Sequence, residues 1–186
     1  MSRSTKPHNL LKLLEGRDRR SIGRVNEIID EVLANPKRFR QIFQGMLSPD
    51  PIIRMRSADA VEKITLQRPE LLQPFKYALI RKVARIAQQE VQWHVAQLLP
   101  RLKLTSRERA AVVAILKEYL SSKSGVVKTF SMQALAEIAE QDISYRAELI
   151  PLLATLTRTG TPAMSSRGRK LLARLTPPGI SPLKEE

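Results

Sequence analysis

Apolar residues recur along this chain at the three- and four-residue spacing of helices that bury one face. Two such stripes are Phe39, Ile42, Phe43 and Met46, and Val112, Ile115, Leu116 and Tyr119. No run alternates apolar and polar residues like a half-buried strand, and no Asn-Gly or Asp-Gly hairpin turn occurs. The pattern predicts an all-α protein.

The stripes are separated by residues that begin or end helices. Examples are Ser48-Pro49-Asp50-Pro51, which offers an N-cap followed by a proline, and Gly160-Thr161-Pro162, which offers a stop followed by a new start. Such punctuation predicts helices of about 10 to 17 residues joined by short turns.

One helical segment is repeated four times. Residues 51–64, 89–102, 125–138 and 162–175 align without gaps, and their starts are 38, 36 and 37 residues apart. The segments before them repeat in step, since Phe39, Phe75, Val112 and Leu149 fall in one column. The repeating unit is therefore a helical hairpin, with an A helix followed by a B helix, and we call the four aligned stretches the B segments.

Aligned positions of the B segments have the same character. The first apolar column is Ile53, Val91, Val127 and Met164, and the last is Ile64, Leu102, Ile138 and Leu175. A third column, Ser57, Val95, Ser131 and Gly168, is mostly small. Small residues predict a place where another helix approaches closely.

The B segments resemble the HEAT repeat family. The best match is the first one, in which Ile53-Arg54 is followed by Ser57, Ala60, Val61 and Ile64. The resemblance covers about residues 36–175. It implies an α-solenoid, a right-handed α–α superhelix of about four hairpins at residues 36–66, 69–103, 106–140 and 144–175.

The chain departs from the family pattern at several positions. Gln92 and Ser165 replace the basic residue, Pro100 interrupts the second B segment, and Gly168 lies inside the fourth. HEAT A helices are often kinked by proline, so the resemblance implies kinks at Pro74 and Pro151. Gly45 is expected to end the first A helix.

The ends of the chain differ from the repeats. Residues 1–35 read as an N-terminal cap with a short helix at 8–15, a basic break, and a longer helix at 21–34 with Ile22, Val25, Ile28, Ile29, Val32 and Leu33 inward. The tail, residues 176–186, has three prolines and no stripe, and we expect it to be disordered.

Composition excludes several kinds of chemistry. The chain of 186 residues has no cysteine and two histidines, and no phosphate-binding glycine loop, calcium loop or zinc motif occurs. We therefore expect no enzyme, metal or cofactor. No apolar run reaches the roughly 18 residues of a membrane span, and the short interrupted run near the start does not match a signal peptide. The expected location is the cytoplasm, or the nucleus in a eukaryote.

The strongest remaining feature is a net charge of +14. In the HEAT-like register several basic residues fall into non-apolar columns of the B helices, which in that family line the concave face. Trp93 and His94 lie on the second B segment and read either as a site or as an ordinary partly exposed helix position. The candidate binding residues are Arg54, Lys63, Trp93, His94, Arg101, Lys128, Arg167, Lys170 and Arg174.

These features predict a non-enzymatic scaffold that binds an acidic protein along a basic B-helix face. The alternative is sequence-independent binding of DNA or RNA through phosphate contacts. A third possibility is a HEAT-like DNA glycosylase, a family that relies on an aromatic-lined cleft with a catalytic aspartate. Against it, no acidic residue stands beside Trp93 in the sequence, although Glu90 lies one helical turn earlier. No membrane and no small-molecule substrate is indicated.

Overall fold

A computed structural model describes residues 9–16, 18 and 21–176, and within these ranges the chain contains helices and no strand. The α-helices are α1 (Val25–Ala34), α2 (Phe39–Gly45), α3 (Pro51–Gln67), α4 (Lys76–Arg81), α5 (Gln89–Leu98), α6 (Ser106–Tyr119), α7 (Gly125–Gln141), α8 (Arg146–Thr159) and α9 (Pro162–Leu175). Short 3-10 helices are η1 (Leu10–Leu14), η2 (Pro36–Arg38), η3 (Pro69–Phe75), η4 (Val83–Arg85), η5 (Leu99–Arg101) and η6 (Ile143–Tyr145). The predicted all-α class is confirmed.

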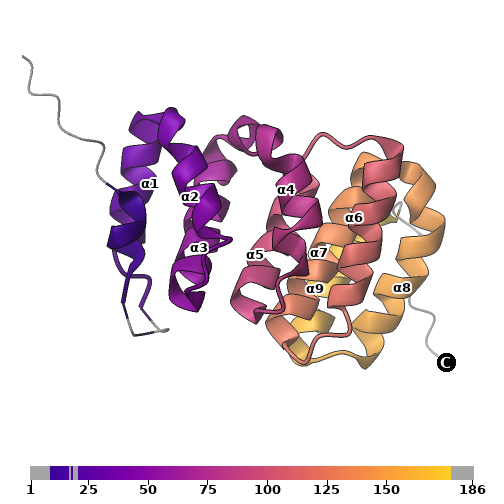
Figure 1. The fold of residues 1–186 in the computed structure, drawn as a ribbon. Helices are drawn as coiled ribbons and strands as arrows, with labels where there is room; N and C mark the ends of the chain where they lie inside the picture. Colours follow the sequence, from indigo (N-terminus) through magenta and orange to yellow (C-terminus); the bar gives the residue numbers. More distant parts are fainter. Residues whose placement is uncertain (1–8, 17, 19–20, 177–186) are drawn as a thin grey trace, which may run out of the picture. The chain divides into compact units, whose positions relative to one another are not determined.

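The chain divides into two compact units, Met1–His94 and Val95–Glu186, and the boundary falls within α5. In the first unit α1 and α2 pack against α3 (Figure 1). Phe39, Phe43 and Phe75 form an aromatic cluster there, with ring centroids 4.5, 5.5 and 6.5 Å apart. The A-helix column of the sequence pattern thus supplies part of this core.

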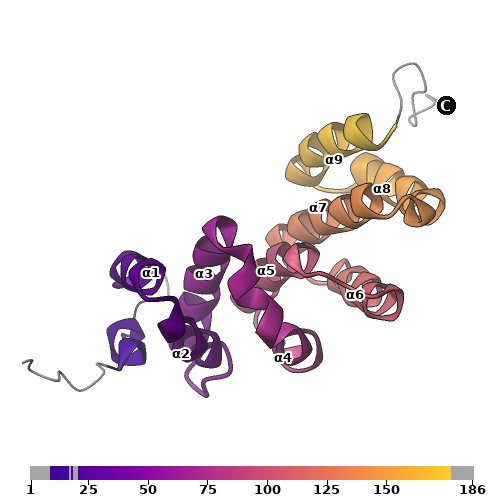
Figure 2. The same ribbon diagram turned by 90° about the horizontal axis from the view of Figure 1, so that it is seen from above.

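In the second unit α7 lies between α6 and α9, and α8 packs along α9 (Figure 2). Helices that are neighbours in the sequence are therefore neighbours in space. The predicted inward positions of the B segments are buried in both units, except Ile53, which is half-buried. Burial of these apolar columns is the main favourable contribution to folding of each unit.

The B helices begin where the repeat pattern predicts, at the first residue of each B segment. Asp50 caps α3 by accepting from Ile52 N at 2.7 Å, and Thr161 caps α9 by accepting from Met164 N at 3.4 Å. Each cap is followed by a proline, which needs no hydrogen-bond acceptor at the first helical position. The α-helical part of the second B segment ends at Leu98, and η5 contains Pro100, as expected from the missing N–H of proline.

The small column of the B segments marks two close helix contacts. A Cβ on Gly45 of α2 would lie 2.1 Å from Ser57 Oγ on α3. A Cβ on Gly168 of α9 would lie 1.9 Å from Thr157 Oγ1 on α8. Gly168 is thus required by packing within its hairpin, although it departs from the family pattern. Helix α2 ends at Gly45 as predicted, but close packing gives this glycine a second role.

The N-terminal prediction is partly wrong. Helix α1 begins at Val25 instead of residue 21, because Gly23 has φ +60°, a left-handed conformation that interrupts a right-handed helix. Ile22, predicted to face inward, is 46% exposed, whereas Ile28 is fully buried. The short helix predicted at 8–15 is the 3-10 helix η1, and its predicted first residue lies outside the described ranges.

Proline acts differently in two A segments. The segment that contains Pro74 is 3-10 helical up to Phe75 and becomes α-helical only in α4. Pro151 instead lies inside a continuous α8.

Of the predicted tail, residues 176–186, the structure describes only Thr176, and the rest lies outside the described residues. Among the residues that are described, no helix combines the length and the apolar character needed to cross a membrane.

Candidate functional site

The first unit contains a cavity of about 390 Å³. Its walls come from the segment just before α1, from α3 and from the first turns of α5. The lining residues are Ser21, Ile22, Met55, Arg56, Asp59, Glu90, Trp93 and His94. The cavity therefore combines apolar, aromatic and charged side chains, which is the usual make-up of a ligand-binding pocket.

Arg56 fixes one wall of this cavity. The residue is 4% exposed, and its guanidinium donates to four backbone carbonyl oxygens, those of Leu14 (2.9 Å), Glu15 (2.8 Å), Asp18 (3.0 Å) and Ser21 (3.0 Å). A buried guanidinium needs such acceptors, because desolvation of its charge is costly. Arg56 thereby holds the segment that precedes α1 against α3.

Two glycines make this arrangement possible. A Cβ on Gly16 or Gly23 would lie 2.7 or 2.9 Å from Arg56 Nη1, closer than a side chain tolerates. Sequence reasoning missed Arg56, because it considered arginines only as surface charges. Two glycines around the basic break at residues 17–20 were the available signal that a bulky group approaches the backbone there.

Asp59 is one of the charged residues that line the cavity. Its Oδ2 is 2.9 Å from Lys63 Nζ one turn later on α3, and its Oδ1 is 3.9 Å from His94 Nε2 on α5. The side chains of Asp59 and His94 are only 15% and 11% exposed.

Trp93 and His94 lie side by side, with ring centroids 5.6 Å apart and planes tilted by 56°. Trp93 is half-buried and His94 is 9% exposed, and both line the cavity. Glu90, one turn before Trp93 on α5, is half-buried, and its carboxylate has no polar partner among the described residues. The fold thus brings two carboxylates to Trp93, one of them from a different helix.

The other predicted binding residue of the first unit is used internally. Arg54 donates from Nη1 to the carbonyl oxygens of Ser48 and Pro49, at 2.8 and 3.0 Å, and from Nε to Gln88 Oε1 at 2.9 Å. Gln88 in turn donates to the Pro51 carbonyl at 2.9 Å. Arg54 therefore links the start of α3 to Gln88, the residue before α5, through hydrogen bonds.

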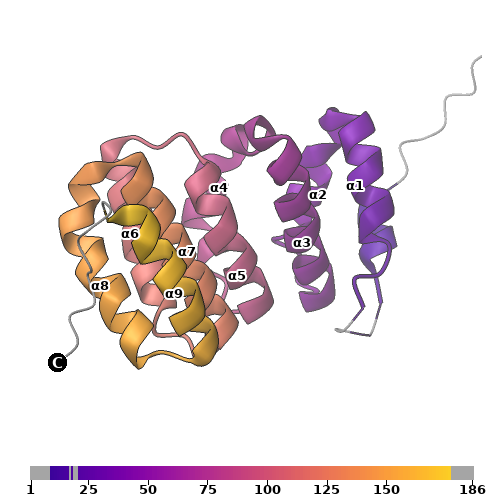
Figure 3. The same ribbon diagram turned by 180° about the vertical axis from the view of Figure 1, so that it is seen from behind.

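Of the predicted basic residues of the second unit, Lys170 and Arg174 are exposed. Helix α9, which lies toward the viewer in Figure 3, has four basic residues and no acidic one in its sequence. Arg167 donates to Gln133 Oε1 of α7, and Arg174 Nη2 lies 2.6 Å from Glu140 Oε2 of α7. Lys170 and its neighbour Arg169 are exposed and have no ion pair with any described residue. Lys128 on α7 and Arg101 on η5 are half-buried.

A polar contact recurs at the same repeat positions in the two units. In the first unit His94 lies near Asp59, and in the second unit Arg167 donates to Gln133. In each pair, the residue at position six of a B segment contacts the residue at position nine of the preceding B segment. The register derived from the sequence therefore aligns side chains of adjacent B helices within each unit.

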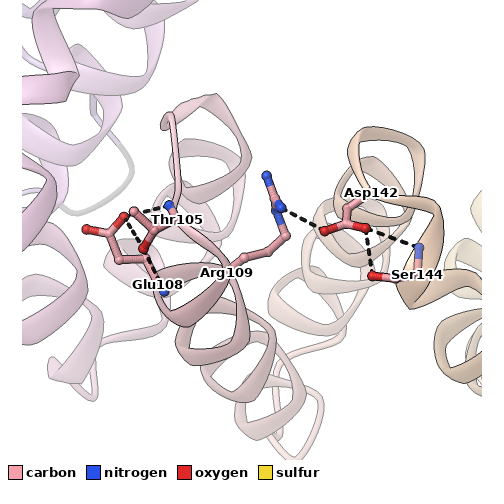
Figure 4. Close-up of polar contacts among 5 residues, drawn as sticks. All are labelled: Thr105, Glu108, Arg109, Asp142 and Ser144. Atoms are coloured by element: carbon pink, nitrogen blue, oxygen red, sulfur yellow. Dashed lines mark hydrogen bonds and ion pairs between the residues drawn. The ribbon is translucent and has the colours of Figure 1, made fainter.

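In the second unit two separate sets of polar contacts lie at the start of α6 and just after the end of α7 (Figure 4). Thr105 and Glu108 form a reciprocal capping box at the start of α6. Arg109 Nη1 lies 2.7 Å from Asp142 Oδ2 just after α7, and Asp142 Oδ1 accepts from the Ser144 N–H (3.1 Å) and hydroxyl (2.6 Å). These Ser144 hydrogen bonds, and after them the Arg109 guanidinium, lower the pKa of Asp142.

In comparisons with known proteins, no family model, no curated protein and no solved structure matches the chain. Among the described residues, no group of three or more histidine, aspartate or glutamate side chains is arranged to hold a metal ion. Within the part of the chain that the structure describes, the cavity around Trp93 and the basic helix α9 are the candidate functional surfaces.

Proposed function

We propose that the chain is a non-enzymatic scaffold of HEAT-like hairpins, an α-solenoid, that binds an acidic protein through the basic B-helix face of its second unit. The observation that supports this proposal is α9, whose four charged residues are all basic. Stacked hairpins hold such residues in fixed positions, so binding orders few new groups and loses little conformational entropy.

The four basic residues of α9 contribute in two ways. Arg167 and Arg174 are oriented by their contacts with Gln133 and Glu140 of α7. An arginine held in this way still has N–H donors for a carboxylate of the partner. Arg169 and Lys170 are exposed, so they supply the long-range attraction that steers an acidic surface toward α9.

Charge reversal on α9 tests the proposal. The variant Arg169→Glu/Lys170→Glu should weaken binding to a polyglutamate peptide, measured by calorimetry, by about tenfold or more. The matched control is Arg107→Glu/Lys123→Glu, which changes the net charge equally at two exposed residues near the start and end of α6. Equal loss in both variants would show that only the overall charge matters and would contradict an α9 site.

The protein partner itself can be sought by capture from nuclease-treated lysate. The proposal expects acidic proteins to be retained by the unmodified chain and the control variant, and to be lost with the α9 variant. If all three retain the same set, α9 does not form the interface.

The second candidate function is nucleic-acid binding by the same residues, which is favoured by the absence of acidic residues on α9. If the four basic side chains contact four phosphates of duplex DNA, the slope of log K against log salt should be about −3.6. Titration of random duplex DNA and RNA at several salt concentrations measures it. A lack of binding at low salt would remove this candidate.

The glycosylase alternative gains one observation. A glycosylase of this kind needs an aspartate near the aromatic side chains of its cleft. Asp59 of α3 lines the same cavity as Trp93, although the two residues are far apart in the sequence. Release of free base from alkylated duplex DNA tests this activity, with Asp59→Asn as the variant. No release by the unmodified chain would exclude it.

A further inference from the structure

We propose that the cavity in the first unit binds an organic cation, an ammonium or guanidinium group on a short alkyl stem, between the Trp93 ring and the carboxylates of Glu90 and Asp59. This goes beyond the proposed function, because the site lies in the other unit and would take a ligand of opposite charge. Its volume of about 390 Å³ falls within the range of small-ligand pockets.

The apolar wall suits the stem of such a ligand. Met55 and Trp93 are half-buried and Ile22 is 46% exposed, so the wall that they form is reachable from solvent. An aromatic face attracts a cation through its quadrupole, and tryptophan does so most strongly among the aromatic side chains. The same wall removes the alkyl stem from water.

Among the described residues, the basic side chains near the cavity are held by other groups. The Arg56 guanidinium keeps its charge but directs its donors to four backbone carbonyls, and Lys63 is paired with Asp59. The Glu90 carboxylate has no polar partner among the described residues. It lies three residues before Trp93 on α5, and this spacing places both side chains on one face of the helix.

The net charge of the whole chain works against this preference. A chain with a formal charge of +14 repels cations at long range, so any cation that binds must be held by local contacts. Binding of a cation to this protein is therefore informative, whereas binding of an anion would be expected at many surfaces.

Trp93 makes the test direct, because it is the only tryptophan of the chain and its fluorescence reports on the cavity. The full chain is titrated with choline, with agmatine and with 3,3-dimethylbutanol, the uncharged counterpart of choline. We expect a saturable fluorescence change with the two cations and none with the alcohol. No saturable change with either cation, or an equal response to the alcohol, would overturn the proposal.

Substitution of the carboxylate separates this site from general electrostatics. Glu90→Gln should raise the Kd for the bound cation by about tenfold or more, since a charged partner is lost. Asp30→Asn is the control, because it removes the same charge from an exposed position of α1 in the same unit. An unchanged Kd in Glu90→Gln, with an unchanged melting curve, would overturn the role of Glu90.

The same titration distinguishes two sources of the cation. A peptide Gly-Arg-Gly or Gly-Lys-Gly that binds more tightly than agmatine would identify a basic side chain of a partner protein as the ligand. Tighter binding of the free amines would identify a small molecule. The charge-reversal variant of α9 should leave both results unchanged, so a failure of the proposed function and a failure of this inference are distinguishable.

Discussion

Arg56 of α3 and Arg167 of α9 occupy the same position of the repeated B segment, and the two units use them differently. Arg56 is 4% exposed and binds four backbone carbonyls of the segment that precedes α1. Arg167 is half-buried and donates to the side chain of Gln133. The role of a basic residue at this repeat position therefore depends on the segment that packs against it. That segment determines whether the side chain is buried in internal hydrogen bonds or stays partly exposed to solvent.

The cavity and α9 extend this contrast. In the first unit, Lys63 and Arg54 are engaged in intramolecular contacts and two carboxylates line the cavity. In the second unit, Arg169 and Lys170 remain exposed. The charged residues of the chain therefore have different surroundings in the two units.

The largest expected effect comes from Arg56→Met. This change removes four hydrogen bonds from a charged donor, and water can then solvate only part of the freed carbonyls of Leu14, Glu15, Asp18 and Ser21. We expect the free energy of unfolding to fall by about 2–4 kcal/mol. Urea denaturation measures the fall, and faster amide hydrogen exchange in α1 would locate it in the first unit.

Arg167→Met is the matched control, with the same substitution at the same repeat position. It should cost less than about 1 kcal/mol, because the side chain is half-buried and has one polar partner. Arg56→Lys should not restore stability, since one ammonium lacks the fork that reaches four carbonyls. Equal losses in Arg56→Met and Arg167→Met would remove the contrast between the units.

Close glycine contacts occur in both units and give the second prediction. Gly168→Ala and Gly45→Ala should each destabilise the fold by about 1–3 kcal/mol through overpacking, although alanine is the better helix former. The Cβ of alanine would meet Thr157 Oγ1 at 1.9 Å and Ser57 Oγ at 2.1 Å. Thermal denaturation of each variant measures the loss.

Gly125→Ala is the control for these two glycines. A Cβ there meets only Thr161 Cγ2, at an ordinary 3.9 Å, so the change should be neutral or stabilising. Adding Ser57→Ala to Gly45→Ala, or Thr157→Ala to Gly168→Ala, should recover part of the loss. Destabilisation by all three glycine substitutions to the same extent would contradict close packing as the cause.

Much of the fold could be predicted because helical periodicity and caps are local. The starts of α3 and α9 follow from Asp50-Pro51 and Thr161-Pro162, and the buried columns follow from the repeat. The predicted start of α1 was wrong, because the pattern of apolar residues continues through Gly23 and does not reveal the left-handed backbone of this glycine.

The candidate site was less predictable than the fold. Trp93 and His94 were noticed, but the residues that complete the cavity come from α3 and from the segment before α1. Sequence alone does not show that Arg56 turns inward while Arg167 of the same column stays half-exposed. The difference depends on a contact between segments about 35 to 42 residues apart.

Acidic side chains just after the B helices give the third prediction. Asp142 follows α7 in the second unit, and Glu70, whose pKa is lowered first by a hydrogen bond from Arg68 and then by its own backbone N–H, follows α3 in the first. A carboxyl with a lowered folded-state pKa stabilises the fold above its unfolded pKa of about 4, and this contribution is lost as the pH falls through the folded value.

Asp142→Asn and Glu70→Gln should therefore lower stability at pH 7, and the difference from the unmodified chain should shrink toward pH 3. The effect of Asp142→Asn should be the larger one, because Asp142 binds both Ser144 and Arg109, whereas Glu70 binds one side chain, that of Arg68 at 2.5 Å. Denaturant unfolding across this pH range measures both. A difference that stays constant with pH would show that the carboxylate charge is not involved.

The smallest expected effect is a difference in sign between two serines of the small column. Ser57 Oγ is buried without a hydrogen-bond partner among the described residues, whereas Ser131 Oγ donates to the Val127 carbonyl at 2.8 Å. Ser57→Ala should be neutral or stabilising, because it removes a polar group that is buried and unsatisfied, and Ser131→Ala should cost about 0.5–1 kcal/mol. Calorimetric melting of the two variants under identical conditions compares them. A greater loss of stability in Ser57→Ala than in Ser131→Ala would contradict this prediction, because it would mean that the Ser57 hydroxyl makes a stabilising hydrogen bond.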